Sequence, residues 1–362
     1  MRQSKLTLET ADLRRPAYNS VPRRSTVDIL IGTSDGLLIV DQSGARTSAS
    51  ELKGRTIRAL VAANGHVFAG ADDGVYRSTD GGRSWRPSGA AGQIVWELAV
   101  DPQNTHTIHA GTQPAALYRS RDGGDSWTKI ESLMQVPGSE RWCVPNNPAG
   151  ARARALAIDP LDPNRWWVGI EVGGVLTSTD AGASWSCVAP GDDPDVHVLV
   201  GHPGRPGVLY ATTGLGRFQD DPQPMRERIA GLFGSQDGGR TWRYLWTGVE
   251  PRYTRPMCID PRAPHALTVG CAPSAFSSHR DPGGAQSRLY QSVDGGASWH
   301  ALGDAEHSPS SANILSVSVA PDGPGCVLVG TDTGELWQVS PEAKWTLLQR
   351  DLPMVWSVLA RG

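Results

Sequence analysis

Apolar residues along the chain fall in short alternating runs that recur with a period of about 40 to 60 residues. Each recurrence starts with an apolar segment, continues with a second that ends near glycine, and leads through a third into a polar turn. Alternating runs broken by Gly, Pro, Asp and Ser predict β-strands and turns, and no long amphipathic helical pattern competes with them. The pattern therefore predicts an all-β protein.

The repeats have the strand content of propeller blades. Six are complete, and their first strands are IRALVA (57–62), VWELAVDP (95–102), ARALAIDP (153–160), VHVLVGHP (196–203), TRPMCIDP (254–261) and ILSVSVAPD (314–322). Three more strands follow in each repeat, which gives a four-stranded antiparallel unit. Units of this size that bury their faces on one another around an axis are typical of a β-propeller.

The two ends of the chain together supply one more blade. Residues 27–44 contain a second and a third strand without a first, whereas MVWSVLARG (354–362) is a first strand with nothing after it. Pairing the C-terminal strand (354–360) with the N-terminal blade (27–50) closes the ring and removes exposed sheet edges. We predict one seven-bladed propeller domain over residues 27–362, with residues 1–26 as an arm outside the repeat.

Five octets mark the turn after the third strand. They are STDGGRSW (78–85), SRDGGDSW (120–127), STDAGASW (178–185), SQDGGRTW (235–242) and SVDGGASW (292–299). Their residue pattern, S/T-x-D-x-G-x-x-W, matches the Asp-box, or bacterial neuraminidase repeat, so the chain resembles Asp-box propellers. That family includes sialidases, sortilin-type receptors, xyloglucan-degrading propellers and photosystem assembly factors. The resemblance implies the fold, whereas function has to be argued from the site.

The recurring octet residues are interpreted as structural. In each box the Asp carboxylate accepts backbone hydrogen bonds, glycine supplies a positive φ and Trp covers the turn. This role is assigned to Asp80, Asp122, Asp180, Asp237 and Asp294, with Trp85, Trp127, Trp185, Trp242 and Trp299. Counting strand reversals places the boxes and the Asp-Pro turns on one rim, so the starts of the first strands lie on the other.

One equivalent position near the start of each first strand carries candidate chemistry. In chain order it is occupied by Arg58, Trp96, Arg154, His197, Arg255, Leu315 and Trp356. Three arginines on alternate blades can converge on one carboxylate, sulfate or phosphate, and the tryptophans offer stacking surfaces. We predict a ligand-binding pocket formed by these Arg, Trp and His residues. The alternative is that the arginines pair with carboxylates of the same rim, for which the candidates are Asp35, Asp72, Asp73, Glu97, Glu171 and Asp195.

Composition limits the partners without naming one. The chain has 362 residues and a formal net charge of −3, which favours neither nucleic acid nor an acidic surface. No secretory signal and no apolar run of about 20 residues is present, so we expect a cytoplasmic protein without a membrane partner. Five cysteines without a CxxC pair, and no metal-ligand or nucleotide-binding spacing, give no reason to expect a metal or a cofactor.

Two functional hypotheses follow. The first is a non-catalytic binding propeller whose partner is a small anionic ligand, an acidic saccharide or an acidic peptide segment. The second is a sialidase-like glycoside hydrolase or a lyase acting on an acidic sugar, with catalytic candidates Tyr253, Glu97, Glu171, Asp72 and His197. The arginines resemble the carboxylate clamp of sialidases, but those enzymes have six blades and an Arg-Ile-Pro motif that this chain lacks. Long segments at 131–152, 214–231 and 272–288 are expected to enlarge the same rim.

Overall fold

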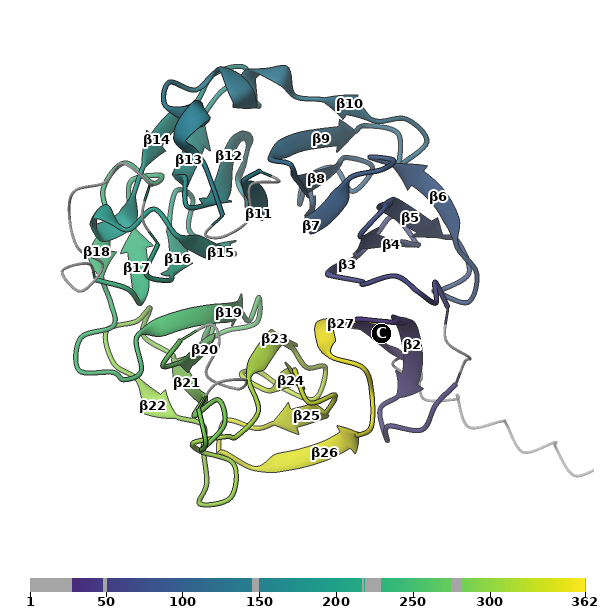
Figure 1. Cartoon of the computed structure of the whole chain (residues 1–362), viewed down its shortest axis with the longest axis vertical. Coiled ribbons are helices and arrows are strands. Elements are labelled where there is room, and N and C mark those ends of the chain that lie inside the picture. Colours follow the sequence, from purple (N-terminus) through teal and green to yellow (C-terminus); the bar gives the residue numbers. More distant parts are fainter. Residues whose placement is uncertain are drawn as a thin grey trace, which may run out of the picture.

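The computed structural model is a ring of seven β-sheets around a central channel (Figure 1). It describes residues 28–47, 51–144, 150–216, 218, 229–274 and 281–361. The arm predicted at residues 1–26 lies outside these residues. The sheets follow one another in chain order, which confirms the predicted seven-bladed propeller.

The four positions of each blade are numbered from the channel outward. The innermost strands are β3 (Ala59–Ala63), β7 (Ile94–Val100), β11 (Arg152–Asp159), β15 (Val196–Gly201), β19 (Tyr253–Ile259), β23 (Ile314–Val319) and β27 (Val355–Arg361). The second strands are β1 (Asp28–Thr33), β4 (His66–Ala71), β8 (Ile108–Gln113), β12 (Asp162–Glu171), β16 (Leu209–Thr213), β20 (Leu267–Ala272) and β24 (Val327–Thr331).

The outer half of each blade is shorter. The third strands are β2 (Gly36–Asp41), β5 (Gly74–Ser78), β9 (Ala116–Ser120), β13 (Gly174–Ser178), β17 (Leu232–Ser235), β21 (Arg288–Ser292) and β25 (Leu336–Val339). The fourth strands are β6 (Arg86–Gly89), β10 (Thr128–Lys129), β14 (Ser186–Val188), β18 (Arg243–Tyr244), β22 (His300–Ala301) and β26 (Trp345–Gln349). The described helices are the short 3₁₀ turns η1 (Glu131–Gln135), η2 (Ser139–Arg141) and η3 (Pro190–Asp192), and none is long and apolar enough to span a bilayer.

The last strand of the chain closes the ring. β27 pairs antiparallel with β1, with Asp28 opposite Arg361 and Gly32 opposite Ser357, in a sheet of order β2-β1-β27. This confirms the predicted closure. The blade departs from the prediction in one respect, because isolated bridges from Leu37 and Val40 replace a regular fourth strand. The segment that follows β2 is rich in Gly, Ser and charged residues and lacks an alternating apolar pattern, and its described residues 42–47 and 51–56 contain no continuous strand.

The hydrophobic core consists of layers between adjacent blades. Between the fourth and fifth blades, for example, the fully buried Trp167 of β12 packs with Val196 and Leu209 of the next blade. Its indole N–H is not left unpaired, because it donates to the carbonyl of Gly238 at 2.9 Å. Each blade therefore needs both neighbours to bury its faces, which makes ring closure an energetic requirement.

The Asp-boxes form the rim that strand counting predicts. Backbone hydrogen bonds join each of two boxes to the turn between the first and second strands of its blade. Gly123 N–H donates to His106 O and Gly238 N–H donates to Gly207 O, both at 2.9 Å, so box and turn lie on the same rim. In the first box Asp80 accepts hydrogen bonds from the backbone N–H groups of Arg83 and Ser84. The bond from the residue four positions after the Asp recurs in the other four boxes, and such bonds, with neighbouring hydroxyls, lower the pKa values of the Asp carboxyls. The boxes are therefore turn-forming elements.

The box tryptophans differ in what their indole N–H groups reach. Those of Trp85 and Trp242 donate to carbonyls of their own boxes. Those of Trp127, Trp185 and Trp299 donate instead to Ser88, Ser132 and the carbonyl of Leu245, which precede these tryptophans by 39 to 54 residues. Trp therefore covers its own turn in some boxes and ties successive blades together in others.

His109 is a buried polar residue that the fold does not satisfy. Its ring is fully buried against Trp166 at 4.5 Å, and neither ring nitrogen has a hydrogen-bond partner among the described residues. Burial, together with nearby Arg119 and Arg121, lowers its pKa from 6.5 to about 3.

Replacing His109 with phenylalanine is expected to stabilise the protein. Phe keeps the ring contact and removes unpaired nitrogens, so we expect a gain of about 1–2 kcal/mol at pH 7 in urea unfolding. In the unfolded chain His109 binds a proton below about pH 6.5, whereas in the native protein it does so only below about pH 3. The stability difference between the variant and wild type should therefore grow as the pH falls from 6.5 to 3. A gain that stays constant down to pH 4 contradicts the assignment.

Candidate functional site

Six of the seven equivalent positions of the first strands lie at a recurring irregularity of the sheets, whereas Arg58 directly precedes the regular strand β3. In β7 the pairing with β8 skips from Val95 to Glu97, so Trp96 has no partner across the ladder. The same register shift leaves Arg154, His197, Leu315 and Trp356 unpaired in their blades. A β-bulge redirects the side chain of its extra residue, and here each one turns toward the channel.

Small residues of the second strands make room for these bulges. A Cβ on Gly111 would lie 2.3 Å from the carbonyl oxygen of Ala153, and one on Gly330 would lie 2.4 Å from the Val355 side chain of the next blade. The fifth blade has Thr212 at this position instead. Its hydroxyl accepts from the N–H of Val198 and donates to the carbonyl of Arg255, both at 3.1 Å, and so connects two adjacent inner strands.

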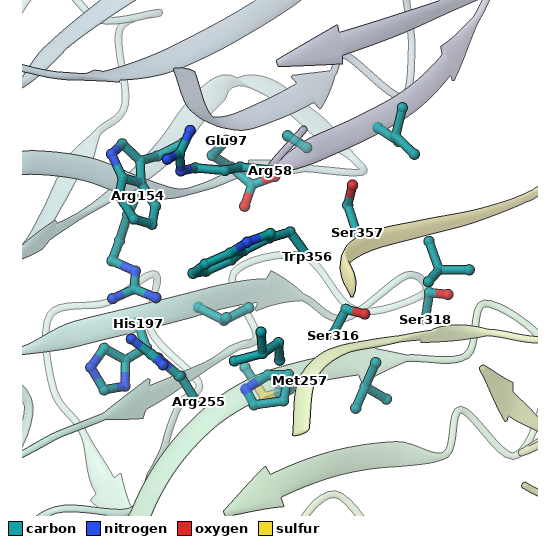
Figure 2. A pocket seen from close by; sticks show the side chains of 18 of the residues that line it. Arg58, Glu97, Arg154, His197, Arg255, Met257, Ser316, Ser318, Trp356 and Ser357 are labelled. Carbon is teal, nitrogen blue, oxygen red and sulfur yellow. The ribbon is translucent and has the colours of Figure 1, made fainter. Parts of the chain in front are cut away.

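The bulge residues line one pocket in the channel. The cavity has a volume of about 280 Å³, and Figure 2 shows the side chains around it. All seven aligned positions contribute, namely Arg58, Trp96, Arg154, His197, Arg255, Leu315 and Trp356. The structure therefore brings together every residue of the predicted constellation, whose role in ligand binding stays a prediction.

Arg154 follows the ion-pair alternative. Its Nη1 lies 2.8 Å from Oε2 of Glu171, which also receives a bond of 3.0 Å from Nη1 of Arg152. Burial alone would raise the pKa of Glu171, but the two guanidinium groups lower it to about 2. The three arginines consequently do not form the symmetric anion clamp that alternate blades suggested, because one of them already has a carboxylate partner.

Arg58 and Trp96 form a stacked group rather than an ion pair. The guanidinium carbon of Arg58 lies 4.8 Å from the Trp96 ring centroid and 5.9 Å from that of Trp356. Arg152 and Arg154 approach the same Trp96 ring at 4.3 and 5.4 Å. Cations thus already contact Trp96, which leaves Trp356 as the better candidate for the predicted stacking surface.

His197, Asp195 and Tyr253 form a compact titratable cluster beside Arg154. Nδ1 of the fully buried His197 donates to the carbonyl of Thr254 at 2.6 Å, which fixes one ring nitrogen as a donor. Its Nε2 lies 3.2 Å from Oδ1 of Asp195 and 3.4 Å from the hydroxyl of Tyr253. Burial raises the pKa of Tyr253 to about 12, so the phenol keeps its proton at neutral pH.

Glu97 lies in the same pocket with the opposite charge state from Glu171. One carboxylate oxygen accepts the N–H of Leu98 at 3.1 Å, and the side chain is only partly exposed, toward the channel. Burial raises its pKa to about 8, despite the opposing effects of that N–H and of Arg154. Glu97 is therefore mostly protonated at neutral pH and is able to donate a hydrogen bond.

The Glu97→Gln variant is expected to change the pH dependence of stability. Because the native pKa is raised, the contribution of Glu97 to stability is fully present below pH 4.5 and is lost as the pH rises through about 8. Gln mimics the neutral acid and has no such loss. Thermal unfolding of both proteins should give similar midpoints at pH 4 and a higher midpoint for the variant at pH 9; a variant equal to wild type at pH 9 contradicts the raised pKa.

The other carboxylates proposed as arginine partners bond elsewhere. Asp35 accepts the N–H of Gly54, and Asp72 accepts that of Thr56 at 3.3 Å. Asp73 pairs with Arg55 at 2.9 Å. Asp72, a catalytic candidate from the sequence, does not line the pocket.

Two residues that support the site were missed from the sequence. Arg152, two positions before Arg154 on the same strand, shares Glu171 and stacks on Trp96. Gln113 accepts hydrogen bonds from Arg152 Nε and from the indole of Trp96, both at 3.1 Å. The available signal was a second arginine at the start of one first strand; the role of Gln113 depends on contacts across blades.

The long segments also meet near this rim. Arg141, in η2 of the 131–152 segment, lies 4.4 Å from the ring centroid of Phe218, which belongs to the 214–231 segment. The structure thus places parts of two of the three insertions together. Most of the second insertion, and residues 275–280 of the third, lie outside the described residues.

Comparison with known proteins relates the chain to xyloglucan-degrading propellers. It is 26% identical over 239 residues to an oligoxyloglucan-reducing end-specific xyloglucanase from Emericella nidulans, a match that spans 56% of this chain and 26% of that protein. No protein-family model matches the chain.

Solved structures share the fold. The GH74 xyloglucanase from Xanthomonas campestris superposes with a TM-score of 0.64 at 21% identity. The match covers 91% of this chain and 53% of the enzyme's chain. The GH74 enzyme from Niastella koreensis gives a TM-score of 0.62 at 17% identity, covering 88% and 46%. The chain thus spans about half the length of these enzymes and about a quarter of the curated relative.

Proposed function

We propose that the channel pocket binds a saccharide of the neutral glucan class and that the chain is a propeller related to glucan-active glycoside hydrolases. The observation that carries the substrate class is the sequence match to a xyloglucanase over 239 residues. It favours the glycosidase-type hypothesis over a binding protein for a free small anion. It also favours a neutral polysaccharide over the acidic sugar expected from the sialidase resemblance.

The composition of the pocket suits a polyhydroxylated ligand. The Trp356 ring lies in the middle of the pocket and offers an apolar surface for stacking on a sugar ring (Figure 2). Arg58 Nε and Nη1 and the hydroxyl of Ser316 are buried without hydrogen-bond partners among the described residues. Protonated Glu97 adds another donor. A sugar hydroxyl both donates and accepts, so one ligand would satisfy these groups together.

Binding of neutral oligosaccharides tests this proposal. We expect xyloglucan-derived oligosaccharides to bind in titration calorimetry and Trp356→Ala to weaken that binding about tenfold. Trp242→Ala on the Asp-box rim is the matched control and should leave the affinity unchanged, with circular dichroism confirming that both variants fold. Equal losses in the two variants, or no binding to any glucan, overturn the proposal.

Hydrolysis is a second candidate because Glu97, which lines the pocket, keeps its proton up to about pH 8. It therefore has the charge state of a general acid in glycoside hydrolysis. Glu171 is ionised but does not line the pocket and is bound by Arg152 and Arg154, so no general base or nucleophile is assigned to it. In this assignment Glu97 donates a proton to the departing glycosidic oxygen.

New reducing ends released from xyloglucan measure this activity. If the assignment is right, Glu97→Gln should lower turnover by at least about a hundredfold while binding is kept. Wild-type protein that binds glucan but releases no reducing ends shows a binding function without hydrolysis.

A further inference from the structure

Two cationic side chains, Arg154 and Arg255, face each other in the pocket. In Figure 2 the guanidinium ends of Arg154 and Arg255 point toward one another beside the His197 ring, at one end of Trp356. Arg58 lies on the other side of that indole, with Glu97. The arrangement sets the Arg154–Arg255 pair apart from the rest of the pocket.

Arg255 has no hydrogen-bonding partner for its side chain within the described residues. Its Nε is buried and unpaired, and no ion pair or hydrogen bond of its guanidinium is found there. Comparable arginines of this propeller are paired: Arg165 with Asp159 at 3.1 Å and Arg262 with Asp260 at 2.8 Å. An unpaired, partly buried guanidinium is costly unless a ligand completes it.

Two carboxylates lie near these arginines, Glu171 and Asp195. Glu171 binds both Arg152 and Arg154, whereas Oδ1 of Asp195 lies 3.2 Å from His197 and has no hydrogen-bond partner among the described residues. Three guanidinium groups thus share two carboxylates on this side of Trp356, and Arg255 is the one that contacts neither. One additional negative group would balance it.

We propose that the space between Arg154 and Arg255 is a subsite for one carboxylate, carried as a substituent of the bound saccharide. A planar carboxylate matches the forked N–H groups of guanidinium, and flanking arginines bind it through charge-assisted hydrogen bonds. The inference rests on the proposed saccharide binding for the rest of the ligand. It refines the neutral glucan class of the proposed function to a chain that is neutral except for one uronic acid unit.

Both arginines are held in place before any ligand arrives. Glu171 anchors Arg154 through Nη1 alone, and the Thr212 hydroxyl holds the backbone carbonyl of Arg255 at 3.1 Å. The β-bulge of each strand directs the side chain inward. A preorganised site of this kind loses little conformational entropy when it binds.

A matched pair of oligosaccharides tests the subsite. One member is a neutral glucan oligosaccharide, and the other is the same molecule with one unit oxidised at C6 to the uronic acid. We expect wild-type protein to bind the uronate form at least about tenfold more tightly in calorimetry at low salt. Arg255→Met should reduce the ratio to about one, Arg255→Lys should keep part of it, and Arg243→Met on the opposite rim should keep all of it.

Free acetate, titrated alone, shows whether the subsite binds a carboxylate that is not attached to a saccharide. Equal wild-type affinities for the two oligosaccharides overturn the subsite but leave neutral glucan binding intact. Acetate binding that is lost in Arg255→Met, without binding of either oligosaccharide, supports the carboxylate site and overturns the glucan proposal. A preference for the uronate that survives in both Arg255 variants overturns the assignment to Arg255.

Discussion

A chain that ends at Pro353 is expected to lose the cooperative unfolding transition of the full-length protein. The deletion removes β27, which supplies the inner strand of the blade that contains β1 and β2. Val355 and Val358 are buried in the layer between this blade and the preceding one, so their loss opens that layer to water. β1 is then left with an unpaired edge that favours aggregation.

Circular dichroism melts and size-exclusion chromatography measure this outcome. A chain that lacks only Gly362 is the control, because this residue follows the last strand, and it should behave as wild type. A synthetic peptide of residues 354–362 added to the shortened chain should restore part of the transition. Unchanged melting of the shortened chain would mean that closure contributes little to stability.

Glu171→Ala is expected to destabilise the folded protein by about 3–5 kcal/mol in urea unfolding. The Glu171 carboxylate is about nine-tenths buried and is shared by Arg152 and Arg154. Removing it leaves two guanidinium groups close together with no countercharge, and Arg154 has a side-chain exposure of only 8%. The main cost is the desolvated positive charge rather than the lost contact.

A double variant separates these two contributions. Glu171→Leu combined with Arg154→Met replaces the buried pair by apolar groups of similar size, and it should recover most of the stability that Glu171→Ala loses. If the double variant is as unstable as Glu171→Ala, the loss arises from packing at this position and the charge argument is wrong.

The sequence determined the architecture because its signals are local and repeated. The five Asp-boxes recur with the same residue pattern, and the alternating runs between them fix strand order and parity. The unpaired first strand at residues 354–360 was enough to predict closure, since a lone strand needs a partner. Alignment alone also identified the seven channel positions, because each occupies the same place near the start of its first strand.

The tertiary structure decided how those side chains interact. No sequence spacing showed that Arg154 would pair with Glu171 while Arg255 stays unpaired, or that guanidinium groups would contact Trp96. These outcomes depend on the β-bulges, on which carboxylate the adjacent strand brings within about 3 Å, and on burial and nearby charges, which give Glu97 and Glu171 opposite charge states. Local patterns encode strands and turns, whereas pairing and protonation arise only when distant strands pack around one channel.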